Sequence, residues 1–254
     1  DITVRETGDI IVQQVNFNST LSPVLDASLS DLTTTDNGPI KLVAGGPITL
    51  ADGATGSMHG NNGLSVRADG TGDILVHATV GNLVVNSDVM SDTGHITLTA
   101  AALLDLNADV LTGGAGTVLL TGGTGIDMQS GTSVTTGGGN VHLNATVGDV
   151  LLGLVNAGTG AVSIEAENDI LDNNGGGTVN VQAGTLRMVA DSDGDTNGSI
   201  GGSDTLNGAA SNDNAIDTAV DVLAAQAADG IYILEADDIT VRETGDIIVQ
   251  QVNF

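Results

Sequence analysis

Short runs of alternating apolar residues recur along the chain, each beginning two residues after a glycine. Gly72, for example, is followed by Ile74 and Val76. Alternation with a period of two is typical of a short β-strand with one buried face. The first apolar residues of five successive runs are separated by 22, 22, 23 and 21 positions; they are Ile74, Ile96, Val118, Val141 and Val162. The pattern therefore predicts strands that return at a nearly constant interval.

Two further apolar clusters follow each run. The second begins eight or nine residues after the first; its members are Leu83 and Val85, Leu104 and Leu106, Ile126 and Met128, Val150 and Leu152, and then Ile170. The third, weaker cluster consists of Val89, Val110, Val134 and Val155. We therefore predict three short strands per coil of about 22 residues.

Stacking such coils places each strand beside its equivalent in the next coil, which pairs the backbone in parallel ladders and buries a continuous aliphatic column. The predicted fold class is therefore all-β, a parallel β-helix or β-solenoid. Gly, Asn and Asp at the corners are expected to adopt the left-handed backbone that tight turns require.

Three stretches depart from the regular pattern. Residues 18–37 are interpreted as a looser coil or loop, residues 51–63 as a stretch where the corners crowd together, and residues 191–229 as an irregular acidic insertion. Within that insertion, 215–229 has apolar residues at helical spacing, but the eight-residue step from Leu223 to Ile231 matches strand spacing instead. The sequence leaves both alternatives open.

The first and last segments of the chain have the same sequence. Residues 1–17 and 238–254 are identical at every position. We interpret residues 1–254 as one elongated β-solenoid, in which 1–237 is one tandem repeat and 238–254 is the start of the next. At about 4.8 Å per coil, one repeat is expected to hold roughly 11 coils and to extend about 50 Å. We expect this chain to be a piece of a longer protein.

Composition narrows the range of partners. There are 32 acidic against 5 basic residues, so the net charge is -27. Such a chain offers no positive face for nucleic acid and is repelled by anionic membranes. No apolar run is long enough to insert into a membrane. The chain has only 3 aromatic residues and 37 glycines, which favours a thin aliphatic core, and it has no cysteine for disulfides or thiolate metal sites.

Several strings carry a resemblance to a known family; they are GDILVHATVGNLVV, GHITLTAAALLDLNADV, GNVHLNATVGDVLLGLVNAGTGAVSIEAENDI and ADGIYILEADDITV. They resemble the filamentous-haemagglutinin-like large exoproteins and giant adhesins of diderm bacteria, over most of residues 38–190 and 230–254. The resemblance implies a right-handed parallel β-helix that is exported across the outer membrane and reaches from the cell surface.

One loop has the spacing of a calcium site. In DGDTNGSIGGSD, residues 193–204, the oxygen ligands Asp193, Asp195, Asn197 and Asp204 occupy positions 1, 3, 5 and 12 of an EF-hand-type loop. Alternate oxygen side chains can converge on one hard cation such as Ca²⁺. The alternative is an acidic surface loop without an ion. Two features suit it: position 12 is Asp rather than Glu, and no helix is evident on either side of the loop.

These features favour a mechanical function. We expect no enzymatic activity and no catalytic or cofactor-binding residues, because Lys41, Arg67 and Arg187 are isolated in the sequence and no Ser, His and Asp arrangement is evident. The expected function is an extracellular fibre, the stalk of a giant repeat adhesin or a surface filament that mediates adhesion or aggregation. The alternatives are a calcium-stabilised glycan-binding module and, less favoured, a β-helix polysaccharide-degrading enzyme.

The expected partners follow from the repeat. Neighbouring identical repeats are expected to contact each other, either within one chain or stacked end to end. A glycan or another cell-surface ligand is an alternative partner. The expected location is the cell surface of a diderm bacterium.

Overall fold

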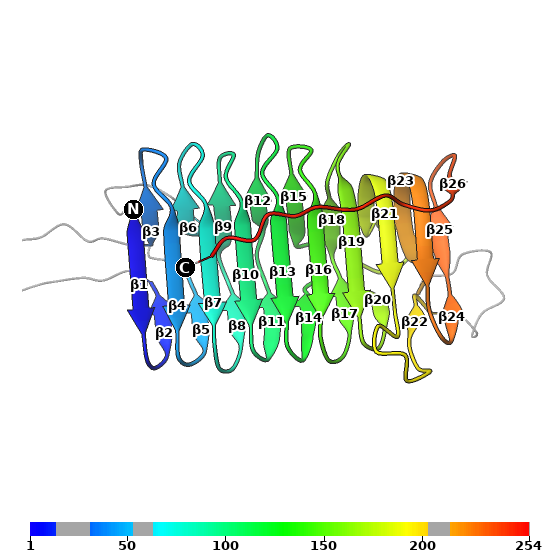
Figure 1. The fold of residues 1–254 in the computed structure, drawn as a ribbon, viewed down its shortest axis with the longest axis horizontal. Coiled ribbons are helices and arrows are strands. Elements are labelled where there is room, and N and C mark those ends of the chain that lie inside the picture. Colours follow the sequence, from blue (N-terminus) through cyan, green and yellow to red (C-terminus); the bar gives the residue numbers. More distant parts are fainter. Residues whose placement is uncertain (14–30, 53–62, 203–213, 254) are drawn as a thin grey trace, which may run out of the picture.

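Parallel strands are the only regular secondary structure in the part of the chain that the computed structural model describes, residues 1–13, 31–52, 63–202 and 214–253. Figure 1 shows these strands side by side along an elongated body, each lying across its long axis. Within the same residues, no helix is present that could cross a membrane.

Each strand pairs in parallel with an equivalent strand further along the chain, which sorts the strands into three rows. Row 1 is formed by β1 (Ile2–Glu6), β4 (Ile40–Ala44), β7 (Ile74–Ala78), β10 (Ile96–Ala100), β13 (Val118–Gly122), β16 (Val141–Ala145), β19 (Ala161–Ala166), β21 (Val181–Val189), β23 (Ile216–Gln226) and β26 (Thr240–Val241). The register within row 1 places Ile96 beside Ile74 on one side and Val118 on the other. The first runs predicted from the sequence are therefore neighbours in space.

Row 2 is a separate nine-stranded sheet. Its strands are β2 (Ile10–Val12), β5 (Ile48–Leu50), β8 (Leu83–Val85), β11 (Leu103–Leu106), β14 (Gly125–Met128), β17 (Val150–Leu152), β20 (Ile170–Asp172), β22 (Ser199–Ile200) and β24 (Gly230–Ile231).

Row 3 joins row 1 in a 17-stranded sheet, because β21 and β23 are long enough to pass through both rows. The remaining strands of row 3 are β3 (Leu32–Thr34), β6 (Leu64–Ala68), β9 (Asp88–Ser91), β12 (Val110–Thr112), β15 (Ser133–Thr136), β18 (Leu154–Asn156) and β25 (Ile233–Glu235).

The core is a column of aliphatic side chains between the rows. Inward positions such as Ile74, Leu104 and Val134 are fully buried, with 0% of their surface exposed. Burying an aliphatic side chain of this size contributes about 1.5–3 kcal/mol. Because the column repeats the same few contacts along its length, three aromatic residues in the whole chain are sufficient.

The corners are joined by polar side chains that reach from one coil to the next. Asp73 Oδ1 accepts the backbone N–H of His95 at 2.8 Å, Asp88 Oδ1 that of Asp109 at 3.0 Å, and Asp109 Oδ1 that of Ser133 at 2.7 Å. The expected left-handed role holds for Asp31, Asn37 and Asp191, but most described residues with a left-handed backbone are glycines. Asp73, Asp88 and Asp109 instead act as acceptors for backbone donors of the next coil.

The structure decides between the two alternatives for 215–229 and revises the expected number of coils. The stretch 215–229 contains strand β23 and no helix, so the strand alternative is correct. Row 1 makes nine pairing steps from β1 to β26, fewer than the 11 coils expected. The reason is that some steps are much longer than the regular interval, since Ile2 pairs with Ile40, and Ile40 in turn pairs with Ile74.

Candidate functional site

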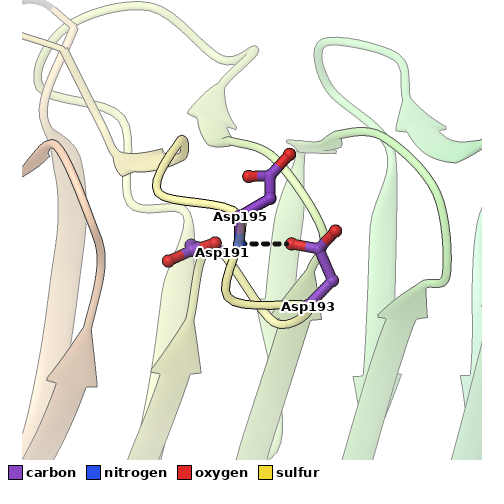
Figure 2. Close-up of side chains that lie close together, drawn as sticks. All are labelled: Asp191, Asp193 and Asp195. Carbon is purple, nitrogen blue, oxygen red and sulfur yellow. Dashed lines mark hydrogen bonds between the residues drawn. The ribbon is translucent and has the colours of Figure 1, made fainter.

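Three carboxylates converge in the loop between β21 and β22 (Figure 2). One oxygen each from Asp191, Asp193 and Asp195 lie within 4.8 Å of one another. The loop is folded locally, because the N–H of Asp195 donates to Asp193 Oδ1 at 3.1 Å and the N–H of Thr196 donates to Asp191 Oδ1 at 3.2 Å. The loop therefore concentrates the negative charge of three carboxylates at the surface.

The predicted calcium ligands are placed in part by this loop. Asp193 and Asp195 lie close together, and the side-chain amide of Asn197 donates to Asp195 Oδ2 at 2.9 Å. Asp204 lies outside the described residues. The sequence reasoning missed Asp191, although its position two residues before Asp193 continues the same alternate spacing. Oxygen ligands of this kind suit a hard cation such as Ca²⁺, while exposed acidic loops also occur without one.

A second candidate surface is the outer face of row 1. Residues 244–253, here called the strap, run back over this face as an extended segment (Figure 1). The N–H of Gln250 donates to Thr117 Oγ1 at 3.0 Å, and the N–H of Val252 donates to Thr97 Oγ1 at 3.0 Å. Under the strap, Thr97 is only 1% exposed although it points away from the core. The face therefore binds an extended backbone.

A cavity of about 270 Å³ lies between the first residues of the strap and row 1. Its walls include His142, Ser163, Glu165 and Arg187, which adjacent strands place side by side. Arg187 forms an ion pair with Glu165 and donates to Ser163 Oγ at 3.2 Å. Burial lowers the pKa of His142. The sequence shows these residues as isolated, and only the coil register brings them together.

Two of the four side chains are paired across the strands. Ser163 Oγ accepts a hydrogen bond from Arg187 Nη1, and its register partner on β16 is His142. A second ion pair joins Arg67 and Asp92 at 3.4 Å. Each of these arginines thus has an acidic partner from the neighbouring coil.

Two carboxylates also meet on the outer face of row 2. Asp105 of β11 pairs in register with Asp127 of β14. Burial, and then the charge of Asp105, raises the pKa of Asp127. Asp105 Oδ1 is buried without a hydrogen-bond partner among the described residues. A carboxyl pair of this kind is what acid–base chemistry would need, and the regular coil spacing that separates the two residues was the signal in the sequence.

Comparison of the chain with protein-family models, with curated proteins and with solved structures finds no match. The function is therefore argued from the fold and the surfaces described above.

Proposed function

We propose that this chain is a rod segment of an extracellular fibre, the stalk of a giant repeat adhesin or a surface filament. The proposed coil has three short strands in about 22 residues and winds in a right-handed sense. The observation that carries the proposal is the continuity of the three rows, which extend from β1–β3 to β24–β26 around one aliphatic column. Because each coil covers its neighbours, adding coils adds length rather than thickness.

The internal repeat supports the same function. The segment 1–17 returns unchanged at 238–254, so the sequence itself repeats over a long period. Neighbouring repeats are the proposed partners, joined within one chain or stacked end to end. Such an arrangement is suited to spanning distance, which is the task of a stalk.

The location at the surface of a diderm bacterium rests on the resemblance to filamentous-haemagglutinin-like exoproteins. The net charge of -27 fits a long rod that must stay apart from its neighbours, because like charges oppose lateral association. We propose no enzymatic activity, since the side chains of the cavity near Arg187 are bound to one another.

The length of engineered arrays tests the rod. Chains with one, two and three copies of the unit 1–237 would be imaged by electron microscopy and measured by small-angle X-ray scattering. Nine pairing steps of roughly 4.8 Å predict that each unit adds about 43 Å at constant diameter. Particles that grow in diameter with each added unit would refute the proposal.

A calcium-stabilised glycan-binding module is a second candidate. The convergence of Asp191, Asp193 and Asp195 favours it, because three carboxylates repel one another unless a cation or solvent offsets their charge. In this alternative Ca²⁺ would be held by these side chains, together with Asn197 and Asp204 of the predicted set. Glycan-array binding by a two-unit chain, with and without Ca²⁺, tests it.

A further inference from the structure

The same short sequence forms two different strands at the two ends of row 1. Residues 2–6 form the five-residue strand β1, whereas the identical residues 239–243 contribute only the two-residue strand β26. Thr240 and Val241 in β26 are the counterparts of Thr3 and Val4 in β1. The difference in length therefore arises from the neighbours, not from the residues.

The register explains why β26 is short. Val4 stacks on Leu42, while Ile2 stacks on Ile40 and begins the column that leads, strand by strand, to Leu223. Val241 is paired with Leu223, so it lies in the column of Ile2 rather than in that of Val4. Strand β26 is therefore displaced by two residues relative to β1.

This displacement has an energetic consequence. If β26 continued in its present register, Glu243 would follow Val241 at the next inward position, against Ala225. Glu243 would bring a carboxylate to the apolar edge of the column, where Val4 brings methyl groups in β1, and the strand ends before it. Val241 is left 74% exposed, whereas Val4 packs against the core.

The last coil presents an apolar end that is only partly covered. Ile231 of β24 pairs with the fully buried Ile200, yet it is itself 46% exposed. At the other end of the body, Ile2, Val4 and Ile10 are only partly buried. Ile10 and Ile231 belong to the same column of row 2. The two ends are therefore complementary in residue type and strand direction.

We infer that the edge of β23 and β24 is a docking surface for a second copy of this chain, whose β1 and β2 displace β26. In this joint Ile2 lies on Leu223, Val4 on Ala225 and Ile10 on Ile231. The longer strand β1 replaces the shorter β26, and no carboxylate faces inward at Ala225. The inference rests on the proposed rod and specifies how separate chains would join it.

Engineered cysteines test the register, because the chain has no cysteine of its own. Thr3→Cys and Ala224→Cys chains would be mixed, oxidised in about 0.5 M salt to screen repulsion, and separated on a non-reducing gel. Paired residues of neighbouring strands lie roughly 5 Å apart, within disulfide reach, and a two-residue displacement places them about 8 Å apart, beyond it. We expect the mixed disulfide dimer to predominate.

Matched variants separate this joint from other contacts. Val4→Asp in the Thr3→Cys chain should reduce dimer capture at least tenfold, while Ile11→Asp, at an outward position 62% exposed, should not. Val241→Asp in the Ala224→Cys chain should increase capture severalfold by weakening β26, and Ile248→Asp, at a strap residue 65% exposed, should leave it unchanged.

Three results would overturn the inference. They are the absence of an interchain disulfide at every mixing ratio, capture by Val222→Cys in preference to Ala224→Cys, and an intrachain disulfide in a Thr240→Cys, Ala224→Cys double variant. The last result would mean that the chain's own segment fills the place assigned to a second copy. None of them would affect the length added by covalently linked units, so the two proposals fail separately.

Discussion

Adjacent leucines on one strand provide the strongest test of the column. Leu104 of β11 is fully buried and stacks between Leu83 and Ile126, which are also 0% exposed, whereas its neighbour Leu103 points outward and is only partly buried. Replacing Leu104 with Ala removes buried carbons and leaves a cavity, for which about 2.7–5 kcal/mol is typical. At about 1.4 kcal/mol per factor of ten, the unfolding equilibrium constant should rise about 100-fold or more.

The Leu103→Ala variant is the matched control, because it makes the same chemical change one residue away on the opposite face. We expect it to cost less than about 1 kcal/mol. Urea unfolding followed by far-UV circular dichroism measures both variants, and the dependence on urea shows whether the unfolded surface has changed. If Leu103→Ala proved as destabilising as Leu104→Ala, the assignment of inward and outward faces would be wrong.

Further predictions concern the corners, the titrating carboxylates and the acidic loop. Asp109→Ala should destabilise the fold by about 1–3 kcal/mol in urea unfolding, because the Ser133 N–H loses its acceptor, while Asp109→Asn should cost less than half as much. The raised pKa of Asp127 favours its protonated form, so its contribution to stability is present below the ordinary value of 3.8 and is lost as pH rises. Asp127→Asn should therefore be more stable than the parent chain in thermal melts at pH 7, with the difference vanishing below pH 3.8; a constant difference would contradict this. EDTA should lower the melting temperature if Ca²⁺ is bound, Asp193→Ala should abolish that shift, and the exposed Asp221→Ala should retain it; no EDTA effect would exclude a stabilising ion.

The strands were predictable from the sequence because period-two alternation and a regular coil interval survive in the pattern of side chains. Ile74, Ile96 and Val118 were expected in equivalent strands, and the structure pairs them in register. The number of coils per repeat was not predictable, since nothing in the pattern shows that Ile2 pairs with Ile40, and Ile40 with Ile74, over intervals much longer than those of the regular coils.

The surfaces were harder to predict than the core. The EF-hand spacing drew attention to Asp193 and Asp195 but not to the adjacent Asp191, because the template begins two residues later. His142, Ser163 and Arg187 share a wall only through the coil register. The strap had no signal at all, since its residues 244–250 are identical to residues 7–13, and the two copies occupy different surroundings.

The direction of the backbone hydrogen bonds has a mechanical consequence. They join strands stacked along the long axis, so a pull on the two ends loads each coil boundary in turn (Figure 1). Once a regular coil such as that from Ile74 to Ile96 is peeled away, its roughly 22 residues can stretch to about 75 Å from an axial height of about 4.8 Å. Under tension the body would therefore lengthen in small increments and absorb work at each one.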